Sequence, residues 1–169
     1  MAKRRTAIAE FTLFGILGAA TFGMKVVMAG LPNIEPVSLM VMLFAVTFGV
    51  KALYPVYVYV MLEFLVYGLN LWSINYLYIW AVLALAARLM RKMEHPLGWA
   101  LLSGGFGLMF GVLCAPVDIF IGGLSYAVGR WVSGIPYDIL HCAGNFVIAL
   151  LLFAPLRRMM ERLYKNMFN

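Results

Sequence analysis

The sequence predicts an all-α integral membrane protein, a single transmembrane domain over residues 1–169 that forms a compact bundle of six membrane-spanning helices. Two features of its composition predict this class, because 64% of the residues are hydrophobic and only 12% are charged. A soluble domain is about 45–50% apolar and about 25% charged, since polar side chains must cover its core. In addition, the runs over residues 97–117 and 139–154 are apolar on every face, unlike the alternating strands of a membrane β-barrel.

Six spans fit both the length of the chain and the breaks in its apolar pattern. A membrane helix needs roughly 20 apolar residues, so the chain has room for about six spans with short connections. A polar break over Leu31–Pro36 follows the first span. The apolar stretch over residues 37–69 is too long for one span, and Lys51 and Pro55 divide it into two shorter helices. The predicted spans cover residues 7–29, 37–50, 54–69, 77–90, 97–115 and 136–156.

The segments between the later spans are polar or rich in glycine. Residues 70–76 are predicted to form a polar and aromatic connection before the fourth span, and residues 91–96 close that span. A glycine-rich segment over residues 116–134 is predicted to connect the fifth and sixth spans.

Lysine and arginine residues set the predicted orientation, because short cytoplasmic loops of membrane proteins are enriched in them. With six spans and both termini in the cytoplasm, all of these residues fall on the cytoplasmic side except Lys25 and Arg130. Treating residues 37–69 as a single span would instead place Arg88, Arg91 and Lys92 outside. The net charge of +6 is therefore explained by topology and calls for no nucleic-acid partner.

Ionisable residues inside apolar spans are energetically costly and are therefore candidates for function. Residues three, four and seven apart share one face of a helix. Such faces are formed on the third span by Glu63, Tyr67 and Asn70, and on the sixth by Asp138, His141 and Asn145. Aromatic, amide and charged side chains surround the outer start of the fourth span and the loop before the sixth: Trp72, Asn75, Tyr76, Tyr78, Trp80, Tyr126, Arg130 and Trp131. Together they predict an outward-facing pocket for a small molecule.

Structural roles remain open for several of these residues. Asp138 follows Ile135-Pro136-Tyr137, an arrangement that also resembles the capped start of a helix. His141 is equally suited to a hydrogen bond between helices. Lys25 could pair with Glu63 or with Asp138 for packing alone.

Small residues recur every four positions on two predicted spans, and such stripes let another helix approach closely. The first stripe comprises Gly15, Ala19 and Gly23, and the second comprises Gly107, Gly111 and Ala115. Internal packing explains a stripe of this kind. The stripe on the first span is equally suited to contact with a partner protein.

The sequence contains none of the common enzyme motifs. It has no His-Glu-x-x-His, Gly-x-Ser-x-Gly, Walker or Cys-x-x-Cys pattern, and no metal-ligand spacing. Cys114 and Cys142 lie near predicted outer helix ends, where a disulfide or two buried thiols would fit. The chain is predicted not to be an enzyme, and to have no catalytic residues, cofactor or metal.

Three local features resemble one family of small membrane proteins. They are the segment Leu31-Pro32-Asn33-Ile34-Glu35-Pro36-Val37, the Gly15/Ala19/Gly23 stripe, and Gly134-Ile135-Pro136-Tyr137-Asp138-Ile139-Leu140-His141-Cys142-Ala143-Gly144-Asn145-Phe146 leading into Ala154-Pro155-Leu156. With its size and its six predicted spans, the chain resembles the substrate-binding S component of an energy-coupling factor (ECF) transporter, a type of ABC importer.

The resemblance implies that this subunit captures a vitamin or related micronutrient outside a bacterial cell and then docks onto a transmembrane T component coupled to two cytoplasmic ATPases. Ala19 and Gly23 match the family's Ala-x-x-x-Ala docking motif, with glycine replacing one alanine, and Gly15 lies one step earlier in the same stripe. Together, the family's pocket positions and the polar stripes give the predicted binding residues Asn33, Glu35, Glu63, Tyr67, Asn75, Tyr78, Arg130, Asp138, His141 and Asn145. A heterocyclic vitamin, a nucleobase derivative and a corrinoid all suit such a pocket.

Three other functional classes remain as alternatives. A small autonomous transporter or channel would work without partners. An intramembrane enzyme would use Asp138, His141 and Glu63 for proton transfer. A structural or assembly subunit would tolerate substitution of all the pocket residues.

Overall fold

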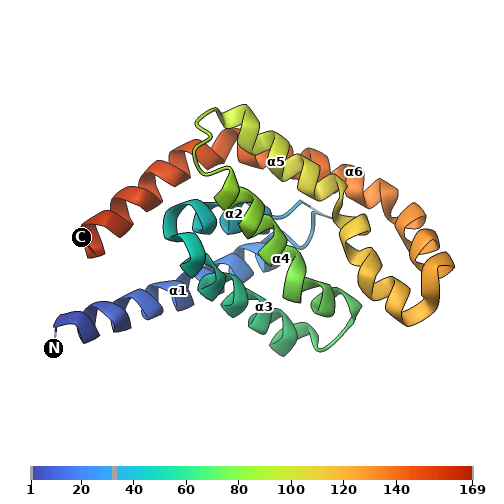
Figure 1. Cartoon of the computed structure of the whole chain (residues 1–169), viewed down its shortest axis with the longest axis horizontal. Coiled ribbons are helices and arrows are strands. Elements are labelled where there is room, and N and C mark those ends of the chain that lie inside the picture. The colour runs from blue at the N-terminus through green and yellow to red at the C-terminus, as the bar shows by residue number, and fades with distance from the viewer. Residues whose placement is uncertain (1, 32–33, 169) are drawn as a thin grey trace.

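Every regular element of the computed structural model is a helix within residues 2–31 and 34–168, the part of the chain that the structure describes (Figure 1). In order, these elements are α1 (Ala2–Val27), α2 (Val37–Phe48), the 3-10 turn η1 (Gly49–Ala52), α3 (Leu53–Tyr67), α4 (Leu71–Leu89), α5 (Pro96–Leu108) and α6 (Phe110–Phe168). The predicted all-α class is confirmed.

Four helical segments of the described residues are long and apolar enough to cross a membrane: Ala7–Val27, Val37–Tyr67, Leu71–Leu89 and Pro96–Phe168. These segments fit a membrane protein, but they number four where the sequence predicts six spans. The reason is length. The 12 residues of α2 and the 13 of α5 extend only about 18–20 Å, against a hydrocarbon core of about 30 Å. Each of them continues into the next helix after a short break.

Helix α2 lies at the centre of the bundle. All residues of Val37–Ala45 are buried, as is Phe48, and the helix contacts α4 and α6 as well as α1 and α3. A helix that is surrounded on all sides needs apolar residues on all its faces, which explains why this segment shows no polar stripe. The hydroxyl of the buried Ser38 is hydrogen-bonded, since its Oγ atom accepts from Asn145 Nδ2 at 3.0 Å.

The chain leaves α2 through a glycine. Gly49 has a φ of +62°, a left-handed conformation that ends the helix, and η1 then leads into α3. Lys51 lies within η1, and Pro55 lies in the first turn of α3, where the missing N–H leaves no hydrogen bond unmade. The break between the predicted second and third spans therefore lies at Gly49–Ala52, just before Pro55.

The predicted connection over residues 70–76 is wrong for most of its length, because α4 begins at Leu71. Asn70 caps this helix, and its Oδ1 atom accepts a hydrogen bond of 3.0 Å from the Ser73 backbone N–H. The polar residues that suggested a loop are thus the cap and the first turns of a helix. The true connection after α3 is short and includes Gly68, with a φ of +75°.

Helices α5 and α6 pack closely because glycine residues line their contact. A Cβ atom on Gly107 of α5 would lie 2.8 Å from the backbone carbonyl of His141. Between the two arms of α6, a Cβ atom on Gly111 would lie 2.6 Å from Asp138 Oδ2. Gly104 similarly faces Cys142. The second predicted small-residue stripe thus serves packing inside the molecule, as expected for close helix contacts.

The predicted glycine-rich connection over residues 116–134 is helical, and this part of the prediction is wrong. Within α6 only Gly123 has non-helical backbone angles, with a φ of +78°, and there the chain turns back on itself (Figure 1). The helix also passes through Pro155 and runs to Phe168, beyond the predicted end of the last span at residue 156. On both sides of Gly123 the helical backbone forms its own hydrogen bonds, which fits segments long and apolar enough to cross a membrane.

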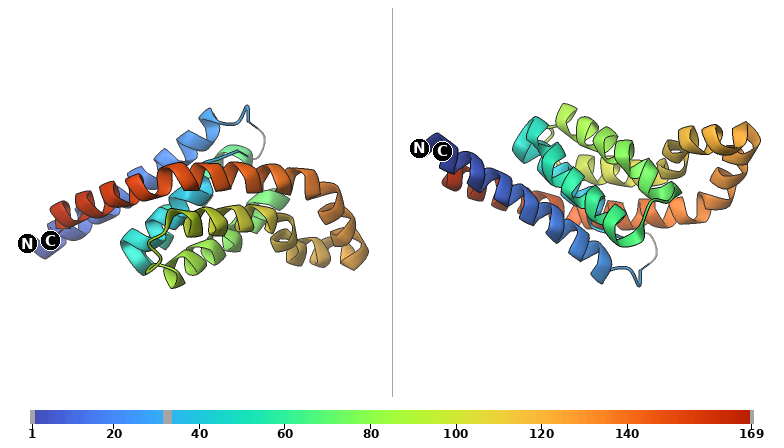
Figure 2. Two further views of the ribbon diagram at one scale, coloured as in Figure 1. Left: turned by 90° about the horizontal axis from the view of Figure 1, so that it is seen from above. Right: turned by 90° about the horizontal axis from the view of Figure 1, so that it is seen from below.

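Both termini lie at the same end of the molecule, and the turn at Gly123 lies at the other (Figures 1 and 2). Basic side chains link several elements near the termini. Lys51 pairs with Glu10 at 2.8 Å, and the Tyr164 hydroxyl also donates to Glu10. Arg157 donates to two backbone carbonyls next to the α4–α5 connection, each at 3.2 Å.

Candidate functional site

A cavity of about 590 Å³ lies at the end of the bundle away from the termini. It is bounded by the end of α1 and the following loop, the ends of α3 and α4 that meet at Gly68, and both arms of α6. Its titratable lining residues are Lys25, Glu35, Asp118, Arg130, Asp138 and His141. Its aromatic lining residues are Tyr67, Trp72, Tyr76, Phe110, Trp131 and Tyr137. The cavity therefore combines apolar walls with several charged groups, as small-molecule sites do.

Lys25 forms the charged centre of one side of the cavity. Its Nζ atom lies 2.8 Å from Glu63 Oε2 and 3.5 Å from the Tyr76 hydroxyl. The same ammonium lies 5.0, 5.7 and 5.9 Å from the ring centroids of Tyr76, Tyr67 and Tyr59, within the range of cation–π attraction. Of the two partners left open by the sequence, the structure pairs Lys25 with Glu63. The Glu63 side chain is only 4% exposed and lies behind Lys25, outside the cavity lining.

Glu35 lies in the loop after α1 and reaches the same side of the cavity. Burial raises the pKa of its carboxyl group, the Lys25 charge lowers that pKa in part, and Glu63 raises it further. Among the described residues, no basic group lies within 4.0 Å of the Glu35 carboxylate, which therefore has no ion pair. The loop is held in place by Ile34, which packs against α6 at Gly144.

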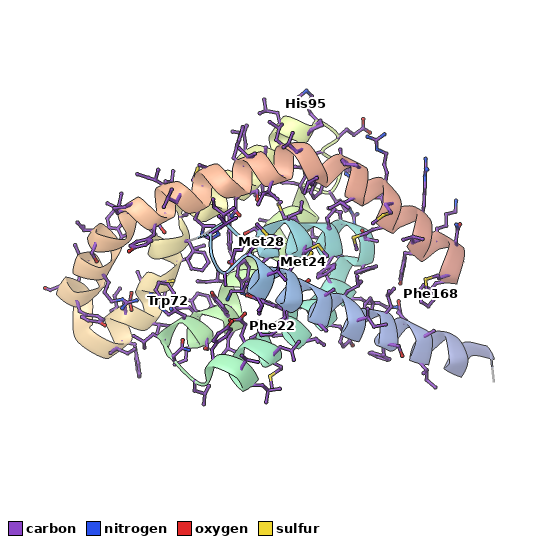
Figure 3. The ribbon with its side chains drawn as sticks, turned by 180° about the vertical axis from the view of Figure 1, so that it is seen from behind. Phe22, Met24, Met28, Trp72, His95 and Phe168 are labelled. Carbon is purple, nitrogen blue, oxygen red and sulfur yellow. The ribbon has the colours of Figure 1, made fainter. Side chains whose placement is uncertain are left out.

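Arg130 occupies the opposite side of the cavity. Its Nε atom lies 3.1 Å from Asp118 Oδ1, in an ion pair whose N–H direction does not meet hydrogen-bond geometry. The guanidinium carbon lies 5.4 Å from the Trp72 ring and 5.9 Å from the Tyr126 ring. Figure 3 shows Trp72 at the start of α4, facing the arm of α6 that precedes Gly123. This ion pair links the two arms of α6, and Arg130 also contacts α4 through the Trp72 ring.

Asp138 and His141 lie one turn apart on the returning arm of α6, and both are buried. Both carboxylate oxygens of Asp138 lie 3.2 Å from the backbone N–H of Gly111, near the start of α6. Asp138 thus caps the start of α6 rather than a new helix at Pro136, because α6 is continuous there. His141 packs against Phe110 with ring centroids 5.0 Å apart, and its buried Nε2 atom has no hydrogen-bond partner among the described residues.

Asn75 and Tyr78 do not line the cavity. Asn75 donates to the Leu71 carbonyl at 2.9 Å, and its Oδ1 lies 2.8 Å from the Tyr78 hydroxyl. That hydroxyl also lies 2.5 Å from the Leu113 carbonyl. These groups satisfy one another and tie α4 to α6, so they position the cavity without facing it.

Asn145 also lies outside the cavity, although it shares a helix face with His141. Its side chain is buried, and its Nδ2 atom lies 3.0 Å from Ser38 Oγ and 3.4 Å from the Ser103 carbonyl. It therefore joins α6 to α2 and α5. Asn33, another predicted binding residue, lies outside the described residues.

Of the ten predicted binding residues, the cavity gathers five: Glu35, Tyr67, Arg130, Asp138 and His141. The predicted set lacked Lys25 and Asp118, although both are ionisable residues outside the basic cytoplasmic groups. A charged residue within an apolar segment is a candidate for function, and this criterion could have identified both. Phe110 carried no signal, because one phenylalanine among many in apolar segments does not stand out.

The stripe of Gly15, Ala19 and Gly23 is left uncovered by the rest of the chain. Nothing lies within 4 Å of a Cβ atom built on Gly15 or Gly23, and Ala19 is exposed. Helix α1 packs on α3 through Gly18 instead, whose added Cβ would lie 2.6 Å from the Pro55 carbonyl. The residues of α1 that make its internal contact are thus distinct from the predicted docking stripe.

Within the described part of the chain, no three histidine, cysteine, aspartate or glutamate side chains converge as a metal site. Comparison with protein-family models, with curated proteins and with solved structures finds no match to this chain.

Proposed function

We propose that this chain is the substrate-capture S component of an ECF-type importer in a bacterial cell membrane. The observation that carries the proposal is the cavity of about 590 Å³, lined by charged and aromatic side chains at one end of a small helical bundle. A binding protein without its own energy source needs such a site and little else. The chain binds a vitamin-like micronutrient there and leaves ATP hydrolysis to partner subunits.

The partner-docking surface in this proposal is the stripe of Gly15, Ala19 and Gly23. Its support is that these small residues lie on a face of α1 that no other part of the described chain covers. Small residues let the backbone of a second helix approach closely, and this favours a transmembrane T component as the occupant. Gly23 and Lys25 differ by about 200° around the helix, so docking and ligand binding use opposite faces of α1.

The proposed topology has six membrane passages and both termini in the cytoplasm. Helices α2 and α3 form two short passages separated at η1, and α5 and the returning arm of α6 form the last two. The position of both termini at one end of the molecule, with basic residues near them, supports this orientation.

Co-purification tests the proposal. The tagged chain, extracted from membranes of its own host in a mild detergent, should recover a second membrane protein and two ATPases. Gly23→Leu should lose these partners, because its side chain blocks the docking face, while ligand binding persists. Gly105→Leu is the matched control, since Gly105 is another exposed helical glycine with nothing within 4 Å of its added Cβ. Recovery of the chain alone, with transport retained after reconstitution, would instead identify an autonomous transporter.

A further inference from the structure

The charges around the cavity are unbalanced, and the imbalance is the same on both of its sides. On the α1 side, Lys25 is accompanied by two carboxyl groups, Glu63 and Glu35. On the α6 side, Arg130 pairs with Asp118, and Asp138 is a second carboxyl group. In the described residues, neither Glu35 nor Asp138 has a basic group within ion-pair distance. Each side of the cavity therefore has one carboxyl group more than it has cations.

Lys25 and Arg130, the two cationic side chains of the cavity, each form an ion pair with a buried carboxylate. The carboxylate side chains that they neutralise, Glu63 and Asp118, are each only 4% exposed. An anionic ligand that drew Lys25 or Arg130 away would leave a buried carboxylate without its partner, which is costly. The same cations also cover aromatic rings, because Lys25 lies over Tyr76 and Arg130 over Trp72.

One aromatic ring next to Asp138 has no such cover. Trp131 lines the cavity, and among the described residues no lysine or arginine lies over its ring. Phe110 also lines the cavity, but its ring is buried and packs against the rings of Tyr76 and His141. Trp131 and Asp138 are neighbours, since an added Cβ on Gly111 would lie 3.1 Å from Trp131 Cδ1 and 2.6 Å from Asp138 Oδ2. A carboxylate beside an uncovered aromatic ring attracts an organic cation both by charge and by cation–π interaction.

His141 adds a second and independent sign of a ligand. The residue is 4% exposed, it lines the cavity, and its Nε2 atom is buried without a hydrogen-bond partner. Buried polar atoms in native proteins are nearly always hydrogen-bonded, so an orphaned one next to a cavity indicates a missing partner. The His141 ring packs against Phe110, another lining residue, with ring centroids 5.0 Å apart.

We propose that the ligand is an organic cation, a flat nitrogen heterocycle whose positive charge lies by Asp138 and the Trp131 ring, and which supplies a hydrogen-bond partner to His141. This inference rests on the proposed function, and it narrows the substrate to a positively charged class. Glu35 attracts the same charge from the opposite side of the cavity.

Three probes of similar two-ring size test the charge preference: the cation 1-methylquinolinium, the neutral quinoline and the anion 1-naphthoate. Isothermal titration calorimetry of the full chain in detergent, at neutral pH, compares them after subtraction of heats measured with protein-free micelles. The cation should bind at least about tenfold more tightly than quinoline, as expected for a charge-assisted contact of about 1.4 kcal/mol or more, and 1-naphthoate should bind most weakly.

Asp138→Asn should remove most of that preference, whereas Glu94→Gln, the same change at an exposed residue outside the cavity, should keep it. Because Asp138 also caps α6, its variant is checked by thermal unfolding. If it does not fold, Glu35→Gln replaces it and should lower the preference in part. Tighter binding of 1-naphthoate, binding of no probe, or a preference unchanged in these variants would overturn the proposal. None of these outcomes affects the recovery of partner subunits, which tests the proposed function separately.

Discussion

Gly107→Ala is the sharpest test of the close packing between α5 and α6. The added Cβ would lie 2.8 Å from the carbonyl carbon and oxygen of His141 and 2.9 Å from the next backbone nitrogen. These are backbone atoms of a packed helix, so they cannot move aside as a flexible side chain would. Overpacking of this kind costs about 1–3 kcal/mol.

The matched control for this substitution is Gly105→Ala on the same helix. Gly105 is exposed and nothing lies within 4 Å of its added Cβ, so the variant only gains the helix preference of alanine, up to about 1 kcal/mol. The same gain applies at Gly107. The difference between the two variants therefore isolates the overpacking cost, and Gly107→Ala should be the less stable variant by about 1–3 kcal/mol.

Equilibrium unfolding in mixed micelles with increasing SDS, followed by tryptophan fluorescence, measures this difference. Gly107→Ala should also weaken ligand binding, because His141 lies at the contact and lines the cavity. Equal stability of Gly107→Ala and Gly105→Ala would refute the close approach of α5 to α6 on which the shape of the cavity depends.

Three further predictions use the same unfolding assay. Lys25→Met should destabilise the chain by about 3 kcal/mol because it leaves the buried Glu63 unpaired, and adding Glu63→Gln should restore part of the loss; a simple sum of the two effects would contradict the pairing. Asn145→Ala should cost about 1 kcal/mol by removing the bond to Ser38, while probe affinity stays unchanged; loss of binding without loss of stability would place Asn145 in the site after all. Glu35 has a raised pKa in the folded chain, so its stabilising effect is complete below the unfolded pKa and is lost as pH rises through the folded value. Wild type should therefore lose stability relative to Glu35→Gln between acidic and neutral pH, and a constant difference would show that the Glu35 pKa is not raised.

Composition and helical spacing predicted the class of the fold and part of the site. Asp138 and His141 are three residues apart, and this spacing alone places both on one face of a helix that lines the cavity. Asn145 follows four residues after His141 on the same face, yet one turn further along α6 that face meets Ser38 instead of the cavity. Spacing thus identifies a face of a helix, but the neighbouring helices decide where along that face a cavity ends.

The sequence alone did not predict which residues far apart in the chain form ion pairs. Lys25 and Glu63 are 38 positions apart, and nothing local distinguishes Glu63 from Asp138 as the partner of Lys25. The start of α4 was misplaced for a different reason. Asn70 and Ser73 resemble loop residues in composition, but they form the hydrogen-bonded cap of a helix.

Both chain ends lie at the far end of the bundle from the cavity, and this has a practical use (Figures 1 and 2). Two halves of a split fluorescent protein, one fused to each end, would meet within a single molecule, so that their effective concentration is set by the linkers rather than by expression level. Their fluorescence would then count folded copies of the chain, since unfolding separates the ends. The reporter would sit well away from the ligand entrance, leaving the site open while the signal is read.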